Sequence, residues 1–371
     1  MKKITKLLSL FLSLGMVIAS ASCGSSDQPP KPAPEPEPPY EYVSLLKDRK
    51  FENGFNVRGL GASIYGDDIE NFPPKYDTDV KFRYDKQDLP VPSWNIAQWA
   101  TRYPFHDINN TVTEEKDGKT TFNYKFTDEG SGKYRYDNQS KTVAVDTKTG
   151  EIELSLKASE CYKYDRTEGQ EWPHLLLEQY IGNAGNPPKQ TALKNTDSLV
   201  VTLDCKLNSF QDKMQGEADK NLHSAVCMLY LFVSYKPAGS AGFTDMMWLG
   251  LTVFDNRTPF SAGMSGADEG TKGSATGKWI YNVPTTKFFS LDNNLYDVDG
   301  NMKFGEWATV EIDMYEYVKA ALSDAQRGGM MKGATLNNLY INGTYLGFEL
   351  PGTYDLDMSF KNFDIKSYIK Q

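Results

Sequence analysis

The stretch that decides the fold is His223–Arg257, HSAVCMLYLFVSYKPAGSAGFTDMMWLGLTVFDNR. Two runs rich in β-branched and aromatic residues flank a Pro- and Gly-rich connection, a pattern typical of two strands and a loop. The first run, residues 225–233, is apolar on both faces. It must therefore be covered on both sides, and we expect it at the centre of a sheet. In the second run Gly250 stands beside Trp248, which predicts either an open ledge for a flat ligand or an ordinary core tryptophan.

The composition fits a large β-rich protein. The 371 residues are 39% hydrophobic and 13% aromatic, enough for a sizeable core in one big β domain or two small ones. The formal net charge of -9 leaves no electrostatic footprint for nucleic acid. We therefore expect no nucleic-acid partner.

The N-terminus has the features of a targeting segment. The first 22 residues contain three lysines and no acidic residue, and Leu7–Ala19 forms a short apolar run that ends just before Cys23. This arrangement resembles a bacterial lipoprotein signal. The resemblance implies that residues 1–22 are removed and that Cys23 carries the lipid, including palmitate. Ordinary secretion with a stray cysteine is the alternative.

A proline-rich spacer follows the cysteine in residues 23–40. Seven prolines between Pro29 and Pro39 favour an extended polyproline II conformation, which holds a folded body away from a surface. Gly24 and Ser25 follow Cys23, and resemblance to lipoprotein sorting signals then implies the outer membrane or the cell surface. The only membrane contact expected is the lipid anchor.

The remainder, residues 41–371, predicts a single large domain. Strands recur at short intervals, and Glu151–Lys157 and Ser198–Asn208 alternate apolar with polar residues. Hairpin turns are predicted at Thr149-Gly150 and at Asn342-Gly343. One helix is expected, at Tyr315–Gln326. The predicted fold is all-β: a two-sheet antiparallel β-sandwich of the jelly-roll type, with one short α-helix near the C-terminus.

The cysteines and one acidic loop raise two smaller questions. Cys205 and Cys227 fall on core faces of predicted strands, so they are buried thiols, or a disulfide if those strands are neighbours. The segment DVDGN, from Asp297 to Asn301, resembles the start of a calcium loop, but its glycine comes one place too early. We favour a plain Asp-Gly turn there, and we expect no metal or cofactor.

The segment Trp172–Ile181, WPHLLLEQYI, carries the most distinctive pattern. On a strand, Leu175, Leu177 and Ile181 would form one face. The other face would hold Trp172, His174, Leu176, Glu178 and Tyr180. Burying unpaired ionisable groups costs several kcal/mol, so a core face seldom needs Glu and His together. The pattern predicts either a ligand-binding face or an ordinary row facing solvent.

The leader, the spacer and an aromatic-rich sandwich together resemble surface glycan-handling lipoproteins of Bacteroidetes-type bacteria. The segment 339–365, LYINGTYLGFELPGTYDLDMSFKNFDI, looks like the closing strands of concanavalin-like or galactose-binding-like domains. No motif in it is diagnostic of one family. The resemblance implies a carbohydrate ligand and, as further partners, other surface proteins of glycan uptake.

Our first hypothesis is a non-catalytic protein that binds poly- or oligosaccharide. Sugar rings stack on flat aromatic faces, while acids, amides and arginine bind the hydroxyl groups. The candidate stacking residues are Trp172, Tyr180, Tyr230 and Trp248, and the candidate polar ligands are His174, Glu178, Asp245, Arg257 and Glu349.

The sequence leaves two alternatives open. A glycoside hydrolase needs two carboxylates about 5 Å or 6.5–9.5 Å apart, and Glu178 with Glu349 or Asp245 are candidates. A polysaccharide lyase needs a base and an acid, for which His174 and a tyrosine are candidates, with Arg257 neutralising a substrate carboxylate. No paired-acid motif is present, so binding is preferred. The last alternative is a structural or adhesive surface protein whose aromatic and acidic side chains do not converge.

Overall fold

The computed structural model describes residues 40–60, 81–101, 103–105, 115–116, 119–120, 124–268 and 276–370. The chain divides into two compact units, residues 1–38 and 39–371, and the described residues belong to the second. The predicted signal segment, Cys23 and the spacer up to residue 39 lie outside them. No helix within the described ranges has the length and apolar character needed to span a bilayer.

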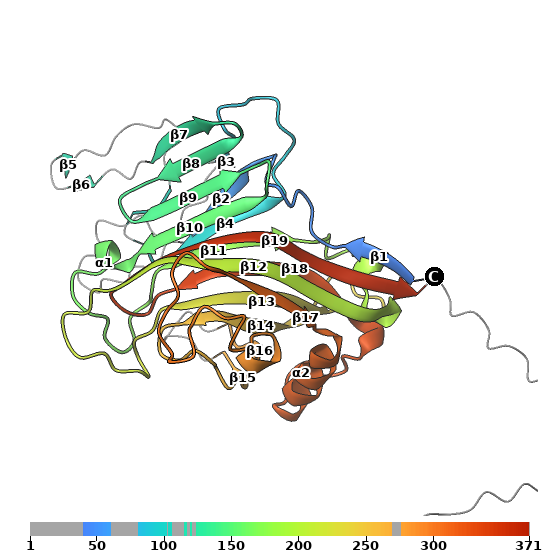
Figure 1. Cartoon of the computed structure of the whole chain (residues 1–371). Coiled ribbons are helices and arrows are strands. Elements are labelled where there is room, and N and C mark those ends of the chain that lie inside the picture. The colour runs from blue at the N-terminus through green and yellow to red at the C-terminus, as the bar shows by residue number, and fades with distance from the viewer. Residues whose placement is uncertain are drawn as a thin grey trace, which may run out of the picture. The chain divides into compact units, whose positions relative to one another are not determined.

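Two large sheets build the second unit (Figure 1). Sheet A has the order β17-β12-β19-β10-β9-β8-β7, and β1 also pairs with β19. Its strands are β1 (Tyr40–Ser44), β7 (Lys125–Gly130), β8 (Lys133–Asp137), β9 (Lys141–Asp146), β10 (Glu151–Lys157), β12 (Thr196–Asp212), β17 (Trp307–Asp313) and β19 (Tyr354–Lys370).

Sheet B has the order β15-β16-β14-β13-β18-β11-β4-β2-β3. Its strands are β2 (Phe55–Leu60), β3 (Lys81–Phe82), β4 (Trp94–Trp99), β11 (His174–Tyr180), β13 (Val226–Tyr235), β14 (Asp245–Asp255), β15 (Met264–Ala267), β16 (Trp279–Val283) and β18 (Leu339–Glu349). A separate pair consists of β5 (Glu115–Lys116) and β6 (Lys119–Thr120).

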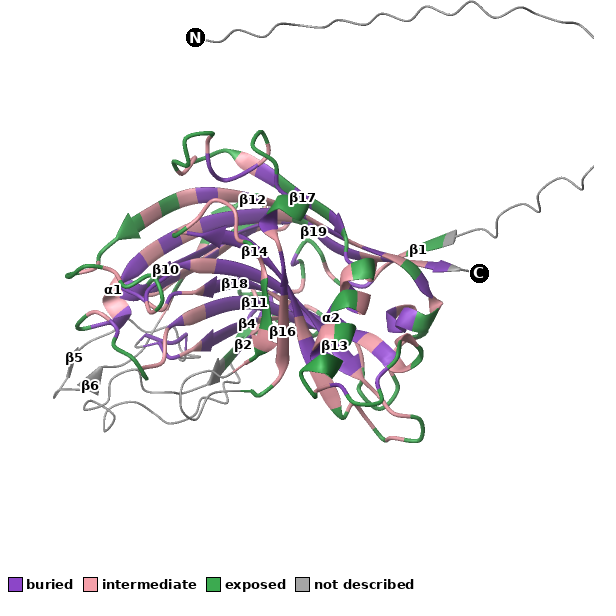
Figure 2. Cartoon of the chain, turned by 90° about the horizontal axis from the view of Figure 1, so that it is seen from below, coloured by how far each residue is buried: buried purple, intermediate pink, exposed green. Residues whose placement is uncertain are grey.

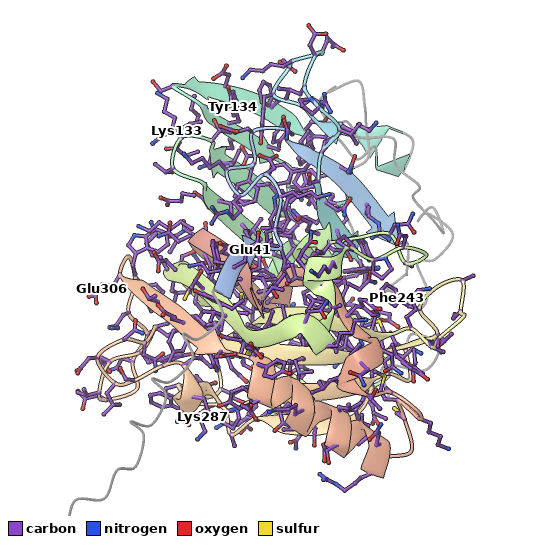
Figure 3. The ribbon with its side chains drawn as sticks, turned by 90° about the vertical axis from the view of Figure 1, so that its right-hand side faces the viewer. Glu41, Lys133, Tyr134, Phe243, Lys287 and Glu306 are labelled. Carbon is purple, nitrogen blue, oxygen red and sulfur yellow. The ribbon has the colours of Figure 1, made fainter. Side chains whose placement is uncertain are left out.

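Helical structure is sparse in the described ranges. The α-helices are α1 (Ala158–Cys161) and α2 (Tyr315–Arg327), and the short 3-10 helices are η2 (Lys189–Thr191), η3 (Leu193–Asn195), η4 (Thr285–Lys287) and η5 (Leu336–Asn338). The predicted helix near the C-terminus is confirmed as α2. Figure 3 shows Lys133 and Tyr134 of β8 at the end of the unit away from this helix.

The all-β sandwich is confirmed, and its core lies between the inner faces of the two sheets. Buried residues alternate with partly exposed ones along most of β12, as an outer-sheet strand requires (Figure 2). The central position predicted for residues 225–233 is also confirmed, because β13 pairs with β14 on one side and with β18 on the other. Sheet B is not wholly antiparallel, unlike the predicted sandwich, since β2 runs parallel to β4 and β14 runs parallel to β16.

One predicted hairpin is confirmed and the other is wrong. Gly150, with φ of +77°, lies in the turn that joins β9 to β10. Asn342-Gly343 makes no turn, because β18 runs unbroken from Leu339 to Glu349. Gly343 pairs with Phe232 and Ile341 with Val233, so Asn342 forms a bulge. Both β11 and β13 pair with this segment, and those two ladders keep it extended.

The two smaller questions have structural answers. Cys205 lies on β12 of sheet A and Cys227 on β13 of sheet B, so their strands are not paired neighbours, and both residues are buried free thiols. In the acidic loop, the Asp297 carboxylate accepts backbone N–H bonds from Asp299 at 2.9 Å and Asn301 at 2.8 Å. Gly300 has a φ of +82°, so the segment is a turn held by its own first side chain.

Candidate ligand-binding surface

The two faces of β11 have different surroundings. Leu175 and Leu177 point into the main core, where both are fully buried. His174, Glu178 and Tyr180 lie on the opposite face, which is the outer face of sheet B. The same register places residues of β4 and β18 beside them, because β11 pairs with both strands. The outer face therefore collects side chains from segments far apart in the sequence.

An aromatic cluster separate from the main core occupies this outer face. Its buried members are Met228, Tyr230 and Phe232, and the partly buried residues packed on them are Val226, Met246, Trp248, Ile280 and Tyr345. The Trp248 ring meets the Phe232 ring edge-on at 4.9 Å between centroids, and Tyr345 lies 5.2 Å from Tyr230. Tyr180 extends the cluster, since its ring lies 5.9 Å from that of Phe232. We call these five rings the aromatic band.

The open ledge predicted beside Trp248 is absent. A Cβ atom added to Gly250 would come within 2.3 Å of Asn282 Oδ1 and 2.4 Å of the Tyr230 ring. Gly250 is therefore needed for close packing and leaves no space for a ligand. Trp248 is no core residue either, because it belongs to the outer cluster and remains partly exposed.

A buried carboxylate with an exposed cation borders the aromatic band. Glu178 is buried, and its Oε2 lies 2.5 Å from Nη1 of Arg58 on β2. Arg58 Nη1 also donates to the Tyr180 hydroxyl at 3.2 Å. Burial raises the pKa of Glu178, although the positive charge of Arg58 opposes this shift. The Arg58 side chain is 44% exposed and the Tyr180 residue 48% exposed, so this corner of the surface is accessible.

A second carboxylate lies where β18 ends. Glu349 Oε1 accepts a bond from the Tyr345 hydroxyl at 3.0 Å, and Oε2 accepts one from Trp172 Nε1 at 3.3 Å. His174 Nδ1 donates to the carbonyl of Trp172 at 2.8 Å, and its Nε2 lies 3.6 Å from Glu349 Oε2. Burial by itself would raise the pKa of Glu349, but His174, Tyr345 and Trp172 outweigh it and the net shift is downward. The carboxylate is therefore held ionised.

Of the nine side chains predicted to bind ligand, seven meet on this face and two do not. Asp245 Oδ1 lies 2.8 Å from Lys278 Nζ, and its Oδ2 accepts the backbone N–H of Met331 at 3.2 Å. Arg257 forms an ion pair of 2.7 Å with Asp255 and donates to the carbonyl of Lys220. Both side chains are engaged away from the aromatic band. Their roles as ligands stay predictions, because neither side chain is placed beside the aromatic band.

Sequence reasoning missed three members of the surface, because Arg58, Phe232 and Tyr345 were not among the candidate ligands. Trp99 was expected to belong either to a sugar platform or to a plug at the end of the sandwich. Tyr345 stands four residues before Glu349 on one strand, a spacing that could have been noticed. Arg58 comes from β2, and only the pairing of β2 with β4 and of β4 with β11 brings it to Glu178. No local pattern carries that information.

The surface has no metal-binding arrangement. Among the described residues, no group of three or more His, Cys, Asp or Glu side chains is placed to hold an ion. The arrangement offers aromatic surface, one neutralised Arg–Glu pair, and one ionised carboxylate with two hydrogen-bond donors and the His174 imidazole beside it. Such a face suits a ligand with both C–H surfaces and hydroxyl groups.

No protein-family model matches the chain, and no curated protein matches it. Similar solved structures include an endoglucanase from Rhodothermus marinus, with a TM-score of 0.34, 10% identity, and coverage of 70% of this chain and 100% of that chain. A family 12 xyloglucanase from Bacillus licheniformis has a TM-score of 0.36, 8% identity, and coverage of 69% and 99%. A family 11 xylanase from Neocallimastix patriciarum has a TM-score of 0.31, 8% identity, and coverage of 66% and 96%. Such low TM-scores and identities establish neither a family nor an activity.

Proposed function

We propose that the protein binds a carbohydrate on the outer face of sheet B. The observation that supports this most strongly is the aromatic band itself, a cluster of rings separate from the main core that ends in the half-exposed Tyr180. The exposed part of the band, which is largest at Tyr180, is apolar ring surface of the kind that marks a binding site. Sugar rings offer apolar C–H faces for that purpose.

The polar groups beside the band fit hydroxyl groups rather than a purely apolar partner. Glu349 is ionised and can accept bonds, while Arg58 presents an exposed guanidinium and can donate them. Each group already has a neighbour of complementary charge or hydrogen-bonding capacity. A neutral sugar can exchange bonds with these pairs without leaving a buried charge unpaired.

The proposal is tested by measuring binding to a panel of poly- and oligosaccharides, followed by affinity electrophoresis of variants. Tyr180→Ala and Trp248→Ala should each lower affinity by about tenfold, as expected for loss of one stacking ring worth roughly 1–1.5 kcal/mol. Trp307→Ala is the matched control, because this partly exposed tryptophan lies on β17 of sheet A. Absence of any binding across the panel, or equal losses in all three variants, would contradict the proposal.

A glycoside hydrolase is the second candidate, and one observation favours it. The pKa of Glu178 is raised and that of Glu349 is lowered, which is how a general acid and an ionised carboxylate are kept apart in such enzymes. The register argues against a direct pair, because Glu349 lies opposite His174, four residues from Glu178 along β11. That offset separates the two backbone positions by about 13 Å along the strands, whereas the carboxyl groups of glycoside hydrolases lie about 5 Å or 6.5–9.5 Å apart. Binding without hydrolysis therefore remains the first proposal.

Hydrolysis is tested by incubating the wild-type protein and Glu178→Gln with every polysaccharide that binds. New reducing ends from the wild type alone would establish the enzyme. Binding by both proteins with no new reducing ends would leave the non-catalytic function.

For location, we propose that Cys23 is lipidated and anchors the chain to the outer membrane or cell surface. Its support is the order of basic residues, apolar run and cysteine in the sequence. Labelling cells with palmitate tests it, with Cys23→Ser as the unlabelled control. A mature N-terminus other than a modified Cys23 would refute it.

A further inference from the structure

Lys141 is a charged side chain fully enclosed by the sandwich. It stands at the start of β9 and is only 2% exposed. Its ammonium donates to Thr101 Oγ1 at 2.6 Å, to Ser140 Oγ at 3.1 Å and to the carbonyl of Tyr103. The Phe105 ring lies 5.6 Å away. All three N–H groups therefore have acceptors, as burial of an ammonium requires.

Two of the three acceptors, on Thr101 and Tyr103, belong to the segment that follows β4 of sheet B, whereas Ser140 directly precedes Lys141. The backbone bends at Ala100, which has a φ of +46°, a conformation that costs free energy for a residue with a Cβ. Gln98 Nε2 donates to the carbonyl of Phe105 at 3.2 Å, and Asn138 Nδ2 donates to that of Tyr103 at 2.7 Å. Lys141 begins β9 of sheet A and Asn138 lies in the connection between β8 and β9, so the segment is held to the opposite sheet.

Trp99, the residue just before Ala100, lies on the candidate surface. The Trp99 ring meets the His174 ring edge-on at 5.5 Å, and His174 in turn lies beside Glu349. Trp99 pairs with His174 in the register of β4 and β11, on the outer face. A shift of the segment after Trp99 would move the indole relative to the imidazole.

We propose that Lys141 is a positioning residue for the carbohydrate surface. Its ammonium holds Thr101 and Tyr103, and this keeps Trp99 against His174 at the edge of the site. The inference rests on the proposed function for its ligand, but the positioning itself is a property of the protein alone. Lys141 touches no ligand and acts only through the segment that it holds.

Titration gives this arrangement a pH dependence. Burial lowers the pKa of Lys141 to about 8, and the thiol of Cys161 on α1 partly opposes the shift. That thiol lies 3.6 Å from Thr101 Oγ1, so both groups share one hydroxyl. A neutral amine has two N–H groups for three acceptors. Above pH 8 one of the three hydrogen bonds donated by Lys141 must therefore be lost, or replaced by one that a hydroxyl donates to the amine.

The test uses the whole protein with fluorinated tryptophan. The 19F resonance of Trp99, assigned with Trp99→Phe, is followed in the wild type from pH 7 to pH 10 and in Lys141→Met. We expect the wild-type resonance to shift with a midpoint near pH 8 and the variant resonance to be displaced and independent of pH in this range. Carbohydrate affinity of the variant should fall by about fivefold or more, while its thermal midpoint stays equal or rises.

Lys86→Met is the matched control, because Lys86 Nζ also contacts an aromatic residue, lying 5.0 Å from the Tyr134 ring centroid, on a different part of the sandwich. It should leave the Trp99 resonance and the affinity unchanged. A wild-type Trp99 resonance that ignores pH, or a Lys141→Met variant with unaltered resonance or affinity, would overturn the inference. If the wild type binds no carbohydrate, the proposed function fails, and the 19F titration still decides whether Lys141 positions Trp99.

Discussion

The burial of Lys141 predicts that the protein becomes more stable as the pH rises from 8 to 10. Its native pKa of about 8 lies below the ordinary lysine pKa of 10.5 that applies to the unfolded chain. Between these values the unfolded state binds more protons than the native state. The free energy of unfolding therefore increases with pH.

The magnitude follows from the shift. A difference of roughly 2.5 pKa units corresponds to about 3 kcal/mol, of which about 2 kcal/mol should be recovered between pH 8 and pH 10. The window ends near pH 10 because burial raises the pKa values of Tyr84, Tyr136 and Tyr230 above that of free tyrosine. Their ionisation in the unfolded state lowers stability at higher pH.

The assay is urea unfolding at half-unit steps from pH 7.5 to 10, with Lys141→Met as the reference. The wild type should gain about 2 kcal/mol relative to the variant across this range. Since methionine carries no charge, the variant should match or exceed the wild type at pH 8. Parallel pH profiles for the two proteins would show that burial does not lower the pKa of Lys141, and the reasoning would then be wrong.

Three further predictions follow from the packing and the buried charges. Gly250→Ala should destabilise the protein by about 2 kcal/mol in urea, because the new Cβ overlaps Asn282 and a buried ring; an unchanged midpoint would contradict this. Asp364→Ala should cost about 2–3 kcal/mol, since this buried carboxylate bonds two hydroxyls of β1 and Arg49; loss below 0.5 kcal/mol would refute it. Burial raises the native pKa of Asp357 to about 6, so the native state binds more protons than the unfolded state between about pH 4 and 6 and stability should fall as the pH rises through that range. Asp357→Asn should abolish this slope, and equal slopes in the two proteins would show the assignment to be wrong.

Much of the fold could be predicted because strand residues alternate between faces. The parity of residues 174–180 assigned the faces of β11, and the two-sided apolar run identified β13 as central. The prediction failed at Asn342-Gly343, where a strong local turn signal was overruled. Two neighbouring strands pair with that segment, and their ladder hydrogen bonds outweigh the preference of two residues.

The candidate site could be predicted only in part. Periodicity says which side chains share a face of one strand, but it does not say which strands lie beside it. Glu178 was recognised as an unusual acid, whereas its partner Arg58 was not, because the two meet only through the order β11-β4-β2. Asp245 was chosen by residue type, and tertiary contacts instead pair it with Lys278.

The sequence by itself determined that the described chain forms a two-sheet sandwich with one longer helix near the C-terminus, because hydrophobic period and turn residues are local properties. Tertiary structure alone decided that Lys141, at the start of β9, would bond Thr101 after Trp99. It also decided that Asn282 would occupy the space beside Gly250. These contacts depend on which faces of the two sheets meet and on how strands pair across many intervening residues. That information is carried by the packing of the whole chain and by no single segment of it.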